Sequence, residues 1–106
     1  MEKDLGQAFR FYLRSAEAGF PNGQNNAGRF YENGWGVERD YGQALSWYRK
    51  AAAQGWAWAE WNLGRMYDEG LGAPRDRATA LGHFRRAAKA GHVQSQEKLR
   101  QLGESW

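Results

Sequence analysis

Cysteine is absent from this 106-residue sequence, so neither disulfide bonds nor thiolate metal sites hold its fold together. Only two prolines and two histidines occur, which leaves few residues for metal ligation or general acid–base catalysis. No hydrophobic run approaches the length of a membrane-spanning helix, and no apolar segment has the form of a signal peptide. We therefore expect a chain that folds by side-chain packing and does not insert into a membrane, while its compartment stays open.

Charge of one sign is not concentrated anywhere along the chain. Fifteen lysines and arginines are interspersed with 12 aspartates and glutamates, and the formal net charge is only +3. Nucleic-acid-binding proteins usually present a dense basic stripe to the phosphate backbone. The mixed pattern therefore disfavours nucleic acid as a partner and is typical of a solvated surface.

The sequence contains three similar copies of one segment, spaced 36 residues apart. The copies are KDLGQAFRFYLRSAEAG at Lys3 to Gly19, RDYGQALSWYRKAAAQG at Arg39 to Gly55, and RDRATALGHFRRAAKAG at Arg75 to Gly91. A fixed period of this size is the signature of architectures that stack one supersecondary unit repeatedly. The repeat therefore predicts a solenoid of stacked units.

Each copy of this segment predicts one amphipathic helix, here called helix B. Asp40 is a candidate N-cap, and Gln43 three residues later completes the pattern of a capping box. Apolar residues then recur at helical spacing on one face, at Ala44, Leu45, Tyr48, Ala51 and Ala52. Gly55 follows where a left-handed C-terminal cap is expected. The other two copies predict equivalent helices that begin after Asp4 and Asp76.

A shorter helical pattern, here called helix A, precedes helix B in each full repeat. In the second full repeat its apolar face and its glycine stop are Ala59, Leu63, Met66, Tyr67, Gly70 and Gly72. Gly28 and Gly64 lie inside helix A, where a glycine costs about 1 kcal/mol relative to alanine. We therefore expect helix A to approach a neighbouring helix closely at these two glycines.

The unit A-x-W-N-L-G-R-M-Y-x-x-G-L-G-x-x-x-D-x-x-x-A-L-x-x-F-R-R-A-A-x-x-G, from Ala59 to Gly91, resembles the Sel-one-like repeat (SLR), a relative of the tetratricopeptide repeat. The resemblance covers nearly the whole chain, 1–106, as a single domain. Its parts are helix B of a half-repeat at 4–19, full repeats at 22–55 and 58–91, and a C-terminal capping helix at 94–103. The resemblance implies an all-α, right-handed solenoid of about six helices, in which helix A lines a concave surface.

The resemblance also implies a scaffold or adaptor and not an enzyme, because proteins of this family are mostly non-catalytic. The residues themselves point the same way. His83 and His92 lie nine residues apart, no serine is set in a nucleophile elbow, and neither a second histidine nor a paired carboxylate lies at helical spacing from His83. We therefore predict no catalytic residue, cofactor or metal site. His83 stands where the other copies have Phe11 and Trp47, and we interpret it as a packing residue.

The candidate partner-binding residues lie on the face of helix A opposite its core residues. They are Trp58, Trp61, Asn62 and Arg65 in the second full repeat, Asn26 and Arg29 in the first, and Lys98 in the last helix. Amides suit the backbone of an extended peptide, guanidinium groups suit carboxylates, and tryptophans often anchor interfaces. We predict that this face binds a protein or peptide with acidic character. The alternative is that Asn62 and Arg65 are structural residues of the repeat and that Trp61 packs against the next helix.

A second class of function stays open at the N-terminal edge. The chain begins with a helix B, so no helix A covers Ala8, Phe9 and Tyr12, and an exposed apolar edge is expected there. The chain is then a piece of a longer array, a naturally short protein, or one that pairs with another chain through this edge. The corresponding function is that of a structural spacer or of a self-assembling array element.

Overall fold

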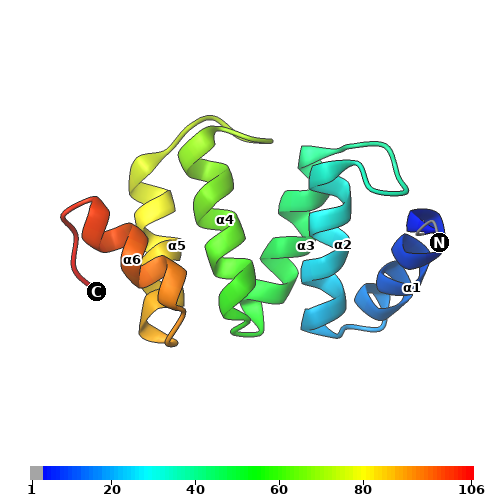
Figure 1. Cartoon of the computed structure of the whole chain (residues 1–106), viewed down its shortest axis with the longest axis horizontal. Helices are drawn as coiled ribbons and strands as arrows, with labels where there is room; N and C mark the ends of the chain where they lie inside the picture. Colours follow the sequence, from blue (N-terminus) through cyan, green and yellow to red (C-terminus); the bar gives the residue numbers. More distant parts are fainter. Residues whose placement is uncertain (1–3) are drawn as a thin grey trace.

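Six α-helices and no strand occur in the computed structural model, which describes residues 4–106 (Figure 1). The helices are α1 (Leu5–Glu17), α2 (Pro21–Asn33), α3 (Tyr41–Ala53), α4 (Ala57–Glu69), α5 (Arg77–Lys89) and α6 (Val93–Gln101). The predicted all-α class and number of helices are confirmed. Residues 1–3, which open the predicted domain and its first repeat copy, lie outside the described residues. No helix of the described part is both long enough and apolar enough to span a bilayer.

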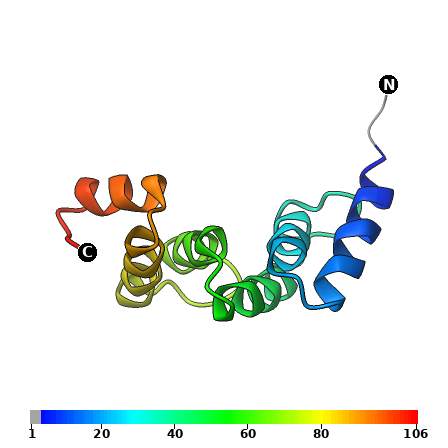
Figure 2. The same cartoon turned by 90° about the horizontal axis from the view of Figure 1, so that it is seen from below.

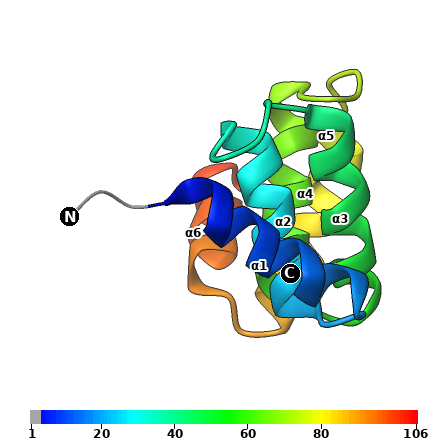
Figure 3. The same cartoon turned by 90° about the vertical axis from the view of Figure 1, so that its right-hand side faces the viewer.

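The helices stack in two layers along an arc that measures 42 × 27 × 24 Å. Seen from below, α2, α4 and α6 lie on the inner side of the arc and α1, α3 and α5 on the outer side (Figure 2). A view along the long axis shows α3 and α5 on one side and α2, α4 and α6 on the other, while α1 crosses obliquely in front of α2 (Figure 3). Each helix makes its extensive contacts with the helices next to it in the sequence. The chain is thus a solenoid, and helix A of each repeat lines its concave side.

The helix ends follow the capping signals in the sequence. Asp4, Asp40 and Asp76 each accept a hydrogen bond from the backbone N–H three residues later, with N···O distances of 2.9, 3.0 and 3.1 Å. Each carboxylate satisfies one of the unpaired N–H groups in the first turn of a helix B. Gly34 and Gly70 end α2 and α4 in the left-handed conformation, with φ angles of 68° and 72°. The N-caps and glycine stops are therefore where the sequence predicts them.

Gly28 and Gly64 bring helix A and helix B of one repeat into close contact. A Cβ atom on Gly28 would lie 2.6 Å from Cε1 of Tyr48, and one on Gly64 would lie 2.6 Å from Cδ1 of Phe84. Both distances are far below van der Waals contact, so each ring occupies the space of the missing side chain. The close approach predicted at these two glycines is confirmed.

Two hydrophobic clusters form the core between the layers. The first, shared by α3 and α4, contains Ala44, Leu45, Tyr48, Leu63 and Met66. The second, shared by α5 and α6, contains Ala80, Phe84, Ala88 and Leu99. The core is therefore a row of local contacts between neighbouring helices and not a single centre.

The N-terminal edge departs from the expectation at Phe9. This residue is only 8% exposed, because its ring packs against Phe30 and Tyr31 of α2, with ring centroids 6.4 and 5.1 Å apart. The prediction that Phe9 is exposed is therefore wrong: α2 covers it without the help of a preceding helix. Ala8 and Tyr12 are half-buried, and Phe11 is exposed.

Candidate functional site

A groove of about 550 Å³ lies on the concave side between α2 and α4. We call it the concave groove, and its lining residues are Asn22, Asn25, Asn26, Arg29, Trp56, Trp58, Trp61 and Asn62. The structure thus brings together five of the predicted site residues, namely Asn26, Arg29, Trp58, Trp61 and Asn62. The other two, Arg65 and Lys98, do not line this groove.

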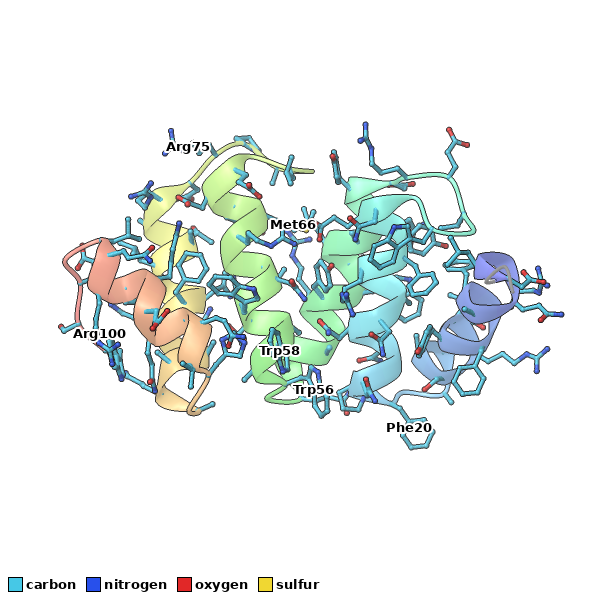
Figure 4. The ribbon with its side chains drawn as sticks, in the orientation of Figure 1. Phe20, Trp56, Trp58, Met66, Arg75 and Arg100 are labelled. Atoms are coloured by element: carbon cyan, nitrogen blue, oxygen red, sulfur yellow. The ribbon has the colours of Figure 1, made fainter. Side chains whose placement is uncertain are left out.

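Tryptophan side chains form one wall of the concave groove. Trp56 and Trp58 lie at the N-terminal end of α4, and Trp58 is 47% exposed (Figure 4). Trp61, one turn later, packs with its ring centroid 5.2 Å from that of Phe84 and 5.5 Å from that of His92. Trp61 therefore lines the groove and also packs against α5 and against the N-cap residue of α6. Trp56 was not among the predicted residues, because it lies just before helix A and therefore outside the face of helix A that was predicted to bind a partner.

His92, the N-cap residue of α6, supports this wall. Its ring centroid lies 4.3 Å from that of Trp58, with the two rings nearly perpendicular at 86°. Nδ1 accepts a hydrogen bond from the backbone N–H of Ser95 at 3.2 Å and thereby caps α6. Nδ1 is thus the unprotonated nitrogen of a neutral ring, and within the described chain Nε2 is buried without a hydrogen-bond partner. Burial lowers the pKa of His92, which keeps the ring neutral.

Asparagine amides from α2 and α4 form the polar part of the concave groove. Nδ2 of Asn62 donates to Oδ1 of Asn25 at 3.0 Å across the repeat boundary, and both residues are buried. Nδ2 of Asn26 donates to Oδ1 of Asn22 at 2.9 Å within α2, at a more exposed position. Asn62 therefore joins two repeats, whereas Asn22 and Asn26 retain amide groups that a ligand can use.

Arg65 forms a second link between α2 and α4. Its Nη2 donates to both carboxylate oxygens of Glu32 at 2.7 Å, and the Tyr48 hydroxyl donates to Oε1 of Glu32 at 2.7 Å. Burial by itself would lower the pKa of Arg65, but the hydrogen bond and charge of Glu32 raise it overall. Burial, and then the Glu32 carboxylate, raise the pKa of Tyr48, so its hydroxyl remains a donor.

Glu32 was not predicted as a site residue, although the sequence holds a signal for it. An acidic residue recurs at this position one and two periods later, as Asp68 and Glu104. These two carboxylates also bind basic side chains: Asp68 accepts from Arg77 Nε at 2.6 Å, and Glu104 from Arg85 Nη2 at 2.8 Å. The recurring acidic residue therefore marks an ion pair at or shortly after the C-terminal end of each helix A.

Arg29 is the counterpart of Arg65 one repeat earlier, but its surroundings differ. Arg29 is exposed, its guanidinium carbon lies 5.6 Å from the ring centroid of Trp35, and it makes no ion pair within residues 4–106. Lys98 lies with Nζ 3.9 Å from Oδ2 of Asp68. The positive charge that the concave groove offers to a ligand is therefore that of Arg29.

A second ionisable cluster joins α4 to α5. Oε2 of Glu60 lies 2.9 Å from Nδ1 of His83 and accepts from Nε of Arg86 at 3.0 Å. Burial acts to raise the pKa of Glu60, but the hydrogen bonds from His83 and Arg86 lower it overall. His83 also stacks on Tyr67 with ring centroids 5.6 Å apart, which agrees with its interpretation as a packing residue. In the described part of the chain, no group of three or more histidine, aspartate or glutamate side chains is placed to hold a metal ion.

Three segments of the chain match a family model described as the Sel1 repeat, at residues 1–20, 21–56 and 59–92. A comparison with curated protein sequences gave no significant match. Among solved structures, a protective antigen present in uropathogenic Escherichia coli strains, which displays an SLR fold, superposes with a TM-score of 0.87 at 36% identity. The alignment covers 91% of this chain and 21% of the antigen chain, so the present chain spans about a fifth of that protein.

Two further structures have the same architecture. A Sel1 repeat protein from Oxalobacter formigenes has a TM-score of 0.83 at 35% identity, over 89% of this chain and 71% of its own. The cysteine rich protein B of Helicobacter pylori has a TM-score of 0.81 at 27% identity, over 88% of this chain and 70% of its own. Sel1 repeats are generally non-catalytic and generally mediate contacts between proteins. The matched units, the shared identity and the stacked helix pairs lead to one conclusion: this chain belongs to the Sel1 repeat family.

Proposed function

We propose that this chain is an interaction module that binds an extended, acidic segment of a partner protein in the concave groove. One observation carries the proposal: the exposed Trp58, the amides around Asn26, and Arg29, which makes no ion pair within residues 4–106, converge within about 550 Å³. An aromatic anchor, a cation and amides that match a peptide backbone are together complementary to such a segment.

The predicted site residues take different roles in this proposal. Asn26, Arg29 and Trp58 contact the partner, because their polar groups or ring faces are accessible in the groove. Trp61 and Asn62 hold the shape of the groove, since Trp61 packs against Phe84 of α5 and Asn62 donates a hydrogen bond to Asn25 of α2. Arg65 holds Glu32, and Lys98 extends the polar surface toward α6 beside Asp68.

The test begins with a random peptide library selected against the immobilised chain. Recovered peptides are then measured by calorimetry against the wild type, Trp58→Ala and Arg29→Gln. We expect each substitution to weaken binding about tenfold or more, the effect of losing one anchor residue. Phe20→Ala is the matched control, because Phe20 is 61% exposed and projects from the α1–α2 turn outside the groove (Figure 4).

The acidic preference has its own control. Replacing each acidic residue of a selected peptide by its amide is expected to weaken binding to the wild type but not to Arg29→Gln. Peptides that bind Trp58→Ala and Arg29→Gln as tightly as the wild type, with unchanged helical circular dichroism, would contradict the proposal.

A further inference from the structure

A second groove, of about 490 Å³, lies between α1, α2 and the loop that follows α2. We call it the N-terminal groove, and its lining residues are Asp4, Leu5, Ala8, Tyr12, Asn26, Arg29, Phe30 and Trp35. The Asp4 carboxylate in this lining accepts the N-cap hydrogen bond of α1 from the backbone N–H of Gln7. It shares Asn26 and Arg29 with the concave groove but has none of the tryptophans of α4. The 36-residue period relates its polar residues Tyr12, Asn26 and Arg29 to Tyr48, Asn62 and Arg65.

The chain therefore contains an occupied copy of this groove. Around Tyr48, Asn62 and Arg65 the occupant is α2. Its Glu32 carboxylate accepts hydrogen bonds from the Tyr48 hydroxyl and from Arg65, each at 2.7 Å. Its Asn25, seven residues earlier, accepts a hydrogen bond from Asn62 at 3.0 Å. The three donors thus recognise a helix by one carboxylate and one amide on the same face.

Within residues 4–106, the equivalent donors Tyr12, Asn26 and Arg29 have no such partner in the N-terminal groove. Arg29 makes no ion pair within residues 4–106, and the Asn26 amide donates only within its own helix, to Asn22. Tyr12 is half-buried, with its ring against Phe30 at a centroid distance of 5.3 Å. The Arg29 guanidinium and the Tyr12 phenol line the same groove, and together they are complementary to a carboxylate.

We propose that the N-terminal groove binds an amphipathic helix of a partner protein through a carboxylate placed between Tyr12 and Arg29. An amide seven residues before that carboxylate pairs with Asn26, as Asn25 pairs with Asn62. The occupant also needs a small residue three positions after its amide. In α2 this position is Gly28, where the Tyr48 ring leaves no room for a Cβ atom.

A second copy of this chain does not meet that requirement. The helix A that would continue the solenoid from its C-terminal end is α6, and Arg100 stands there at the position of Gly28 and Gly64. The Arg100 guanidinium also lies 5.5 Å from the ring centroid of Trp106. The Arg100 side chain would occupy the space that a Tyr12 ring from another copy needs, so we expect head-to-tail stacking of copies to be disfavoured.

The test uses a synthetic peptide that copies residues 20–34, the helix that fills the equivalent groove. A hydrocarbon staple joins the positions of Arg29 and Asn33, which are both exposed in α2, so that the peptide is helical before it binds. The matched control peptide carries Glu32→Gln. Binding is followed by nitrogen-15 NMR on the full chain, with the Trp35 indole N–H as the reporter in the groove.

We expect the peptide to shift the signals of Arg29 and Trp35, and the Glu32→Gln peptide to bind about tenfold more weakly, since the charge-assisted hydrogen bonds are lost. Tyr12→Phe and Arg29→Gln in the chain are expected to weaken binding of the original peptide and to remove its advantage over the control. Trp58→Ala is expected to leave this binding unchanged, which separates the N-terminal groove from the function proposed for the concave groove.

Three results would overturn the proposal. The first is equal binding of the two peptides, or no binding of either at millimolar concentration. The second is a set of shifts confined to Trp58 and Trp61. The third is sedimentation of the wild-type chain as an oligomer that Arg29→Gln dissociates, because a second copy would then be the occupant.

Discussion

Gly64 allows the Phe84 ring to pack closely against α4, because that ring lies 2.6 Å from the position that a Cβ atom of residue 64 would occupy. We expect Gly64→Ala to lower the free energy of unfolding by about 1–3 kcal/mol, since the ring must move out of a packed interface. Gly82, inside α5, faces only Arg86 Nη1 at 3.9 Å, and Gly82→Ala is expected to raise stability by about 0.5–1 kcal/mol through helix propensity. Urea unfolding followed by circular dichroism compares the two, and equal effects would contradict the packing argument.

Glu32 holds two side chains at once, the Arg65 guanidinium and the Tyr48 hydroxyl. We expect Glu32→Gln to cost about 1.5–3 kcal/mol, because a half-buried arginine loses its charged partner. The matched control is Glu69→Gln, which removes the other carboxylate near Arg65, at 3.3 Å on an exposed side chain. That change is expected to cost only about 0.3–0.5 kcal/mol. Similar losses of unfolding free energy in the two variants would show that Glu32 is not the main partner of Arg65.

At the scale of residues, the sequence predicts local roles better than distant partnerships. The roles of Gly28 and Gly64 follow from their place inside a helical pattern, and the structure confirms them. The role of Arg65 depends on Glu32, which lies 33 residues earlier on another repeat. The burial of Phe9 likewise depends on how closely α2 approaches α1, which the pattern of one helix does not contain.

At the scale of elements, α2, α4 and α6 show that equivalent helices can use one position differently. Gln24 and Gln96 donate from Nε2 to the carbonyl groups of Ala16 and Ala88, at 3.3 and 3.0 Å, near the end of the preceding helix. Glu60 occupies the same position in α4, but a carboxylate has no N–H to donate. It binds His83 and Arg86 of the following helix instead. The period therefore predicts the helices and their order, but not which neighbour each polar side chain contacts.

The cap of α6 is expected to make stability depend on pH. Burial lowers the pKa of His92 below its ordinary 6.5, so the neutral ring stabilises the fold at higher pH, and this contribution is lost as pH falls below 6.5. Protonation of Nδ1 removes the acceptor for the Ser95 N–H and places a positive charge at the N-terminus of α6.

The measurement compares the wild type with His92→Asn, because asparagine caps helices without titrating. Between pH 7.5 and 5, we expect the wild type to lose about 1 kcal/mol more unfolding free energy than the variant, roughly the worth of one N-cap. Other titrating groups are common to both proteins and cancel in the difference. Parallel loss in the two proteins would rule out His92 as the source.

At the scale of the whole molecule, stability is expected to vary along the arc. Extensive contacts join only helices that are neighbours in sequence, so α1 and α6 each have one such partner, while α3 and α4 have two and share a core cluster. We expect amide hydrogen exchange to be at least about tenfold faster in α1 and α6 than in α3 and α4. Uniform protection in all helices would mean that the described chain unfolds only as a single unit.

The solenoid itself could be predicted from the sequence, because one period determines both the helices and their stacking. The concave groove could be predicted only in part. The helical spacing predicts that Trp58 and Asn26 lie on the partner-binding face of helix A, whereas Trp56 precedes helix A and is not predicted by this spacing. The size of the groove depends on the curvature of the arc and on the contact between Asn25 and Asn62. Neither can be predicted from the sequence pattern of one repeat, because both depend on how two repeats pack together.

The two links between α2 and α4 have a consequence for the entropy of binding. The Asn25–Asn62 and Glu32–Arg65 hydrogen bonds are separated along each helix by about one or two turns, so together they fix both the spacing and the tilt of the two helices. Without these hydrogen bonds, α2 and α4 would lose conformational entropy when a ligand binds between them. With the bonds formed, this entropy is already lost when the chain folds. We therefore expect the concave groove to be preorganised for the segment proposed above, so that binding costs little conformational freedom of α2 and α4.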